Sequence, residues 1–445
     1  MKKLLVLVLL CAHSICYGQR FSEESVKDDL IFLKSSIRSF NPGLDKFNPE
    51  FDKQADELIK NSDNESTTLL NLYQKVSELS ALSNEGHFDV TSKLIFGGFG
   101  QNEYLYLPIT VIVLEGSLYV WFDLSNEQLM DRGNEILNIN GKSAQEILQT
   151  IYKYFPSDGL ITTYIDRTMA SKFPLQFYLY VDQSTEFELS IIDNSGNEKL
   201  VQVAALDRSV QIGNYQKFYP NEEAANEPPF STLTFEDNIA FLTLPSFDSR
   251  KVNDFEIKSK KLYEEIIIEV IEKKTQHLVI DLRNNSGERN EFAYDIVPFI
   301  NRNEILTGNL LTSTAWDGKT RQVKIPKSAK QVYHNAIYLL VNGRTYGAAG
   351  VMARYLKEFG DAIVIGEETG SRYEGFVGEP TKYINLPYSK ITIGIPGYLQ
   401  TFPQSEKQPT TNRGLIPDHE IHLTINDVIN DQDPQMEFVK TLIKR

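Results

Sequence analysis

The stretch that decides the fold is residues 277–287, which read HLVIDLRNNSG. The apolar residues at its start are typical of a buried strand, which ends at Asp281 in a polar turn that contains a glycine. Residues 337–350, which read IYLLVNGRTYGAAG, repeat the pattern with a strand, a tight turn and a helix start made of small residues. Two such units predict strands of one parallel or mixed sheet that is covered by helices.

The segments around these two units continue the alternation through residues 237–430. We expect further strands at residues 239–244 and 362–365, and helices at about residues 255–273 and 348–359. In open sheets of this kind, functional side chains gather where buried strands give way to loops and helix N-termini. The turns after the two strands quoted above are therefore the first places to look for a site.

The first half of the chain has different patterns. Residues 20–90 read as helical, with Ser66 and Thr67 as capping residues before the last apolar stripe. Residues 100–215 read mostly as β-structure, with a tight turn at Asn140-Gly141. Residues 208–236 contain three prolines and have weak periodicity, which predicts a connector.

The N-terminus has the features of an export signal. Lys2 and Lys3 form a short basic start, an apolar run follows, and small residues precede an expected cleavage after Gly18. The alternative is a buried N-terminal helix. Residues 1–18 contain both cysteines, so the mature chain would have none and would suit an oxidising compartment. We therefore expect an exported protein, periplasmic or extracellular, without a transmembrane anchor.

Length and charge limit the classes of function that this chain can have. The chain has 445 residues, which is enough for about three domains, and 41% of them are hydrophobic, which is enough for a folded core. The formal net charge is -15. This charge argues against nucleic acid as a partner, because phosphate binding needs a basic face. Nothing in the sequence indicates an oligomeric state or a cofactor.

Six segments in a fixed order carry a resemblance to a known family. They are Asn41–Leu44, Glu85–Phe88, Gly133–Gly141, Asp281–Gly287, Gly366–Gly370 and Gly414–Asp418. In this order they are similar to segments of the tail-specific (C-terminal processing) serine peptidases and their tricorn-type relatives. The likeness spans nearly the whole mature chain.

The resemblance implies an α+β or α/β fold with an N-terminal helical segment, a PDZ-like β-rich insert and an α/β peptidase core. The core would be of ClpP/crotonase-like type with a mixed sheet. The domain limits that follow are a signal peptide at 1–18, a helical region at 19–92, a PDZ-like domain at 93–215 and a core at 216–445.

The resemblance also identifies site positions, and the decisive one does not match. The family's elbow reads Thr-aromatic-Ser-Ala-Ala with the serine as nucleophile, whereas Gly347 stands at the serine position here. Glycine has no oxygen to attack a carbonyl. Arg372 occupies the position of the lysine base of the C-terminal processing branch and cannot act as a base. The acidic residue expected in the elbow helix is replaced by Gly350, and the second glycine of the Asp281 motif by Glu288.

Other members of the site are retained. Backbone N–H groups of Gly287 and Ala348 would form the oxyanion hole. Glu85-Gly86-His87-Phe88 resembles the segment that bears the catalytic histidine in tricorn-type members, so His87 is a candidate base. The alternative is a histidine kept for packing. Ser371, beside Arg372, is another candidate for a relocated nucleophile.

No metal site is expected. His419 and His422 flank Glu420, but in an extended segment residues three apart project to different faces.

Two functions from different classes follow. The first is an exported protein with the peptidase fold that binds peptides or unfolded protein termini with impaired catalysis. It is favoured by four departures from the family's pattern at one site, at Gly347, Gly350, Arg372 and Glu288. The alternative is an active serine-type peptidase that cleaves exported proteins with a relocated nucleophile such as Ser371. Both take a peptide or protein as partner.

Overall fold

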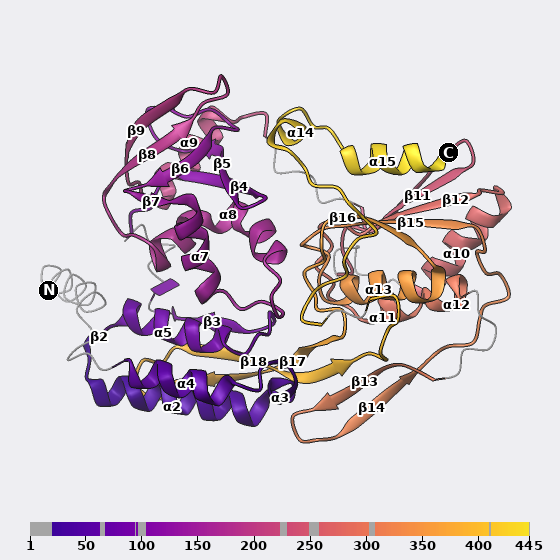
Figure 1. The fold of residues 1–445 in the computed structure, drawn as a ribbon, viewed down its shortest axis with the longest axis horizontal. Helices are drawn as coiled ribbons and strands as arrows, with labels where there is room; N and C mark the ends of the chain where they lie inside the picture. The colour runs from indigo at the N-terminus through magenta and orange to yellow at the C-terminus, as the bar shows by residue number, and fades with distance from the viewer. Residues whose placement is uncertain are drawn as a thin grey trace, which may run out of the picture.

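The computed structural model describes residues 20–62, 67–93, 95–96, 104–222, 229–248, 258–301, 308–408 and 411–444. The predicted signal peptide at 1–18 lies outside these residues. The described chain combines mixed and antiparallel sheets with helices (Figure 1), so the predicted fold class is confirmed. None of its described helices is both long enough and apolar enough to cross a membrane.

The central sheet is the mixed sheet that the two quoted stretches predict. Its strands, in spatial order, are β10 (Thr232–Glu236), β11 (Ile239–Thr243), β12 (His277–Asp281), β15 (Ala336–Val341), β16 (Ile363–Gly366) and β19 (His419–Glu420). The β10–β11 pair is antiparallel and every later pair is parallel. The strands β12 and β15 are neighbours, so their carboxyl ends meet at one edge of the sheet.

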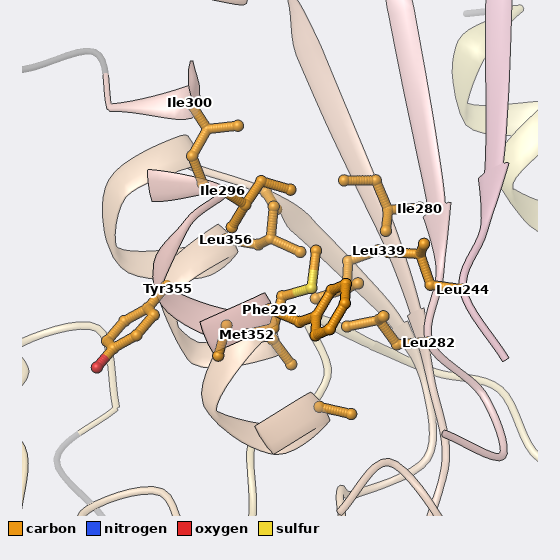
Figure 2. Packing of buried hydrophobic residues seen from close by; sticks show 14 of the residues in the cluster. Leu244, Ile280, Leu282, Phe292, Ile296, Ile300, Leu339, Met352, Tyr355 and Leu356 are labelled. Carbon is orange, nitrogen blue, oxygen red and sulfur yellow. The ribbon is translucent and has the colours of Figure 1, made fainter. Parts of the chain in front are cut away.

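Helices cover both faces of this sheet. One face is covered by α10 (Ser259–Glu272), α11 (Glu291–Tyr294), α12 (Val297–Ile300) and α13 (Ala348–Gly360), and the other by α15 (Pro434–Ile443), which follows α14 (Ile425–Ile429). Figure 2 shows Met352 and Leu356 of α13 facing Leu339 of β15. The apolar residues on one side of α13 thus bury the helix against the strand that leads into it.

A second lobe contains the predicted β-rich region. Its antiparallel sheet has the order β4 (Ile109–Leu114), β5 (Ser117–Asp123), β6 (Glu135–Ile139), β8 (Glu186–Ile192) and β9 (Glu198–Ala204), with β7 (Lys142–Ser143) beside β6. Asn140 and Gly141 form the predicted turn with φ of 49° and 75°. The PDZ-like identity of the lobe and the limits at 93 and 215 stay predictions.

Three helices complete this lobe. They are α7 (Ala144–Tyr154), α8 (Thr163–Tyr180) and α9 (Arg208–Phe218). The sequence pattern did not predict α8, because the helix contains Pro174 and because its buried side chains divide between two hydrophobic clusters. The same pattern predicted a connector in place of α9. That reading was wrong because Asp207 caps the helix by accepting from the Val210 N–H.

The predicted helical region forms a third layer, which lies along a long hairpin (Figure 1). Its helices are α2 (Glu23–Phe40), α3 (Leu44–Phe47), α4 (Phe51–Lys60) and α5 (Leu69–Ala81). The paired strands β1 (Arg20–Phe21) and β2 (Thr67–Thr68) precede α2 and α5, respectively. The cap of α5 is Thr68 rather than Thr67, since Thr67 pairs with Phe21, and Ser66 lies outside the described residues.

The hairpin joins this layer to the central sheet. It consists of β17 (Gly375–Asn385) and β18 (Thr392–Thr401), which belong to a sheet with β14 (Thr320–Lys324), β13 (Asn309–Ala315) and β3 (Asp89–Thr91). Buried Asp29 of α2 accepts the N–H groups of Tyr388 and Ser389 at the hairpin turn, at 2.8 and 2.9 Å. The hairpin therefore carries residues of the core lobe next to those of the N-terminal layer.

We expect Leu339→Ala to lower the free energy of unfolding by about 2–5 kcal/mol, because Leu339 is fully buried between the sheet and α13. Denaturant titration measures the change. Leu200→Ala is the control, since Leu200 is 71% exposed and its truncation should change stability by no more than about 0.5 kcal/mol. Equal effects of the two substitutions would contradict this packing.

Candidate functional site

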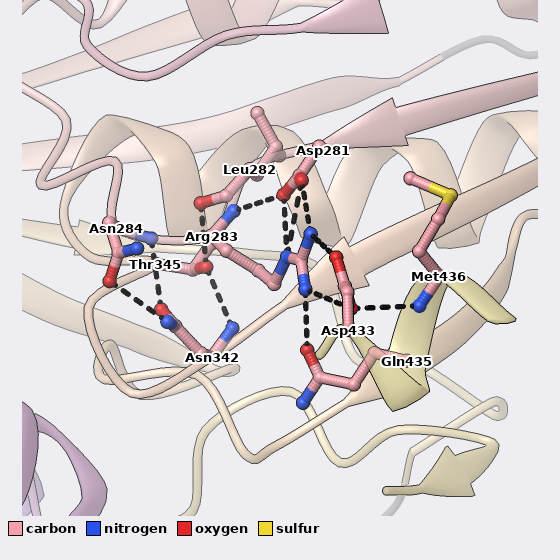
Figure 3. Close-up of polar contacts among 9 residues, drawn as sticks. All are labelled: Asp281, Leu282, Arg283, Asn284, Asn342, Thr345, Asp433, Gln435 and Met436. Atoms are coloured by element: carbon pink, nitrogen blue, oxygen red, sulfur yellow. Dashed lines mark hydrogen bonds and ion pairs between the residues drawn. The ribbon is translucent and has the colours of Figure 1, made fainter. Parts of the chain in front are cut away.

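The turn after β12 is held by an ion-pair network. Figure 3 shows the Arg283 guanidinium between the carboxylates of Asp281 and Asp433, with Gln435 beside it. Arg283 donates to Asp433 at 2.8 and 2.7 Å and to Asp281 at 2.7 to 3.1 Å. Both carboxylates raise the pKa of Arg283, although burial opposes this. The polar residues of this turn thus bind α15 to the sheet and are structural.

The turns after β12 and β15 are joined directly to each other. Asn284 and Asn342 exchange hydrogen bonds at 3.0 Å, and the Thr345 hydroxyl donates to the Leu282 carbonyl at 2.9 Å and accepts from the Asn342 N–H (Figure 3). Thr345 is therefore not the cap of the following helix. The N-cap position is Gly347, which has no side-chain bond.

Gly347 forms a sharp elbow between β15 and α13. Its φ of 54° and ψ of -127° are strained for any residue with a Cβ. A Cβ built on Gly347 would lie 4.0 Å from His87 Nε2 and 3.2 Å from the Ser286 carbonyl oxygen. The predicted nucleophile position therefore faces the predicted base, although no side-chain atom is present at that position.

His87 is held in a stack of aromatic rings. Its ring lies 4.7 Å from that of Tyr346 and 5.1 Å from that of Phe376, both nearly parallel, and Tyr164 stacks on the outer face of Tyr346 at 4.3 Å. His87 Nδ1 is 2.8 Å from the Tyr346 hydroxyl. Gly86 allows this approach, because a Cβ there would lie 2.6 Å from the same hydroxyl. The stack fixes the ring so that Nε2 points towards Gly347.

The ionisation of this pair follows from burial. Burial lowers the pKa of His87, although Asp158 and Glu379 oppose the shift. Burial also raises the pKa of Tyr346 well above its usual value. The imidazole is therefore neutral near pH 7 and the phenol keeps its proton. Depending on the tautomer, Nε2 offers a lone pair or an N–H to a group bound beside Gly347.

Arg372 is paired with buried Glu85 and does not belong to the stack of aromatic rings around His87. Its guanidinium donates to Glu85 at 3.1 Å, both side chains are fully buried, and it covers the ring of Phe47 at 3.8 Å. Asp158 accepts the backbone N–H groups of Gly86 and Arg372. Two acids thus surround one buried cation. Burial, with Asp158 nearby, raises the pKa of Glu85 to about 8 in spite of Arg372.

Ser371 lies behind the elbow. Its hydroxyl oxygen accepts the Gly347 N–H at 2.7 Å, and the side chain is 3% exposed. It also fills the place beside Gly350, where a Cβ would lie 2.9 Å from Ser371 Cβ. Gly350 therefore leaves room for the Ser371 side chain. The Ser371 hydroxyl in turn supports the elbow.

The predicted oxyanion donors are adjacent but not equally free. A Cβ on Gly287 would lie 2.5 Å from Ala348 N, so the two residues are in contact. The Gly287 N–H donates to Asn285 Oδ1 at 2.9 Å, which removes it from the predicted pair in this conformation. The Ala348 N–H has no hydrogen bond among the described residues. One of the two predicted donors is therefore open to a ligand.

Glu288 does not occupy the oxyanion position. Its carboxylate accepts the Phe247 N–H at 3.0 Å and the hydroxyls of Ser246 and Ser286 at 3.2 and 2.8 Å. The side chain therefore holds the loop after β11 against the turn after β12.

A cleft of about 570 Å³ opens in front of the elbow. Its described lining comes from every part of the site: His87, Tyr164, Asp248, Ser286, Glu288, Arg289, Asn290, Tyr346, Gly347, Ala348, Phe376, Gly378, Glu379 and Gln400. Arg372, Ser371 and Gly287 are not on its surface. Sequence reasoning missed Tyr164, Phe376 and Gln400, which lie far from the motifs. The only signal for Phe376 and Gln400 is their pairing across β17 and β18, which a single sequence does not reveal, and Tyr164 lies on α8.

Comparisons with known proteins agree with this architecture. Residues 238–421 match the sequence profile of peptidase family S41. The structure is similar to mature CPAF, with a TM-score of 0.63 and 15% identity over 91% of this chain and 94% of that chain. It is also similar to mature CPAF complexed with lactacystin, with a TM-score of 0.65 and 16% identity over 94% and 97%. A search of curated proteins found no significant match. The fold is that of an S41 peptidase with a mixed sheet.

Thr345→Val should lower the free energy of unfolding by about 1–3 kcal/mol, because the Asn342 N–H and the Leu282 carbonyl both lose a buried partner. Denaturant titration checks this value. Thr392→Val, at a partly exposed hydroxyl on β18, is the control and should have a smaller effect. No difference between the two variants would show that the hydroxyl of Thr345 does not hold the turns together.

Glu85→Gln tests the buried cluster through pH. Between its ordinary pKa of 4.5 and about 8, Glu85 keeps a proton in the folded state that the unfolded chain has lost. Its contribution to stability is therefore present below about pH 4.5 and is lost as pH rises to 8. The variant carries no such proton. Its stability relative to the parent should rise with pH across this window, by up to about 1.4 kcal/mol per pH unit, in denaturant titrations. A difference independent of pH would contradict the raised pKa.

Proposed function

We propose that this chain, whose residues 238–421 match peptidase family S41, binds peptides or unfolded protein termini in its cleft and does not cleave them. One observation carries the proposal: the position 4.0 Å from His87 Nε2 is the Cβ site of a glycine. A retained base therefore faces a place with no nucleophile. The peptidase fold supports a polypeptide as the ligand.

The rest of the site supports binding. The elbow, the open Ala348 N–H and the ring stack around His87 are intact, and the cleft in front of them is large enough for several residues of an extended chain. His87 Nε2–H and the Ala348 N–H offer donors to carbonyl oxygens of that chain. These are the contacts that bind a substrate, and they do not require a serine.

The alternative of a relocated nucleophile has less support. Ser371 is bonded to the Gly347 N–H, is buried behind the elbow and does not line the cleft. Arg372 is paired with Glu85 and stays protonated. Neither group reaches the cleft surface in this conformation.

The proposal includes export, which rests on residues 1–18 of the sequence alone. The protein would act in the periplasm or outside the cell. There it would hold protein segments that active relatives of the fold would cut.

Restoring the nucleophile tests the proposal. Gly347→Ser should cleave fluorescein-labelled casein at least about 100-fold faster than the parent chain, because the new hydroxyl would come within hydrogen-bond reach of His87. Gly347→Ala is the matched control, since it adds the same backbone strain without the oxygen. It should be as inactive as the parent. The parent should bind the same casein in an anisotropy titration.

A second variant decides between the two functions. Turnover by the parent chain that disappears in His87→Ala would overturn the binding-only function in favour of an active peptidase. Failure of the parent to bind casein would overturn the binding function itself. Inactivity of Gly347→Ser with intact binding would show that the scaffold has lost more than the hydroxyl.

A further inference from the structure

Gln400 has an unusual position in the cleft wall. It lies on β18 directly opposite Phe376 of β17, the residue that stacks on His87. Cross-strand neighbours share one face of the sheet, so the Gln400 side chain lies beside the ring stack. It lines the cleft although it is only 6% exposed. The amide is therefore a deep feature of the wall and not a rim group.

The acceptor atom of this amide has no protein partner. Gln400 Oε1 is buried and has no hydrogen-bond partner among the described residues. Its Nε2 faces Gly378, and a Cβ built on Gly378 would lie 3.8 Å from this nitrogen. A buried, unpaired carbonyl is costly, and native structures rarely keep one without a reason. A ligand that donates a hydrogen bond in the cleft would remove this cost.

The charge of the cleft indicates what kind of donor fits. Its described lining holds three carboxylates, Asp248, Glu288 and Glu379, and one cationic side chain, Arg289. The Arg289 guanidinium lies 3.7 Å from the carboxylate of Glu291, a residue that does not line the cleft. Glu379 is exposed, directly follows Gly378 on β17, and acts electrostatically on His87. A neutral histidine adds no positive charge, so the field in the cleft favours a cation.

We propose that Gln400 and Glu379 together recognise a basic side chain, arginine or lysine, in the polypeptide segment that the cleft binds. This inference rests on the proposed function and names the class of segment. Gln400 Oε1 accepts one N–H of the guanidinium or ammonium group, and the Glu379 carboxylate supplies the counter-charge. Both groups are acceptors, and arginine offers several donors in one plane to satisfy them.

A pair of labelled peptides tests the inference. Two fluorescein-labelled 12-residue peptides of glycine, serine and alanine would differ only at the centre, with arginine in one and citrulline in the other. Citrulline keeps the shape of arginine without its charge. The full chain should bind the arginine peptide at least about 10-fold more tightly in anisotropy titrations, which corresponds to about 1.4 kcal/mol. Raised salt should reduce the difference.

Variants assign the effect to the two residues. Gln400→Met keeps the side-chain length but removes the acceptor, and Glu379→Gln removes the charge. Each should weaken binding of the arginine peptide at least about 3-fold and change the affinity for the citrulline peptide by no more than about 2-fold. Gln322→Met, at an exposed glutamine of β14, is the control and should change neither affinity.

A readout on the free protein separates recognition from support of the fold. Because its Oε1 is unpaired, Gln400→Met should leave the midpoint of thermal unfolding equal to or above that of the parent. A lower midpoint would show that the amide supports the fold and would overturn the ligand role. Equal binding of the two peptides would overturn the inference and leave the proposed function standing. Binding of neither peptide, with casein also unbound, would mean that the proposed function has failed.

Discussion

The buried hydrogen bond from Arg372 to Glu85 is the interaction on which the site depends. It joins residues that are 287 positions apart, and both side chains are fully buried. A buried charge is tolerated only when its partner and its hydrogen bonds are in place. The second oxygen of Glu85 accepts the Val377 N–H at 2.8 Å, and Asp158 of the second lobe accepts the Arg372 N–H. Three parts of the chain therefore meet at one cation.

The consequence is the position of His87. Glu85 and His87 lie on the same loop. The hydrogen bond between Glu85 and β17 therefore places His87 against Phe376 and Tyr346. The turns after β12 and β15 are held independently by Asn284, Asn342 and Thr345. Two separately stabilised units thus meet at the cleft. This explains how the geometry of a peptidase site persists without a nucleophile: none of the contacts that build it involves a hydroxyl at position 347.

Much of the central sheet follows from local pattern. The strands β12 and β15 and the helix α13 were predicted within one or two residues, because apolar runs that end in glycine-containing turns are a local signal. The long hairpin of β17 and β18 was not predicted. Its residues alternate weakly, and its pairing partners lie in three regions of the chain. The same hairpin supplies Phe376 and Gln400, so the missed element is also the source of the missed site residues.

The sequence by itself determined that residue 347 has no hydroxyl, that residue 372 is an arginine, and that strands leading into turns 281–287 and 342–350 form one sheet. These are properties of residue identity and short-range periodicity. Only the tertiary structure decided that His87 faces Gly347, that Arg372 is turned to Glu85, that Ser371 supports the elbow and that Gln400 Oε1 has no hydrogen-bond partner among the described residues. Each of these depends on side chains from distant segments packing together, and local propensity carries no information on which distant segments meet.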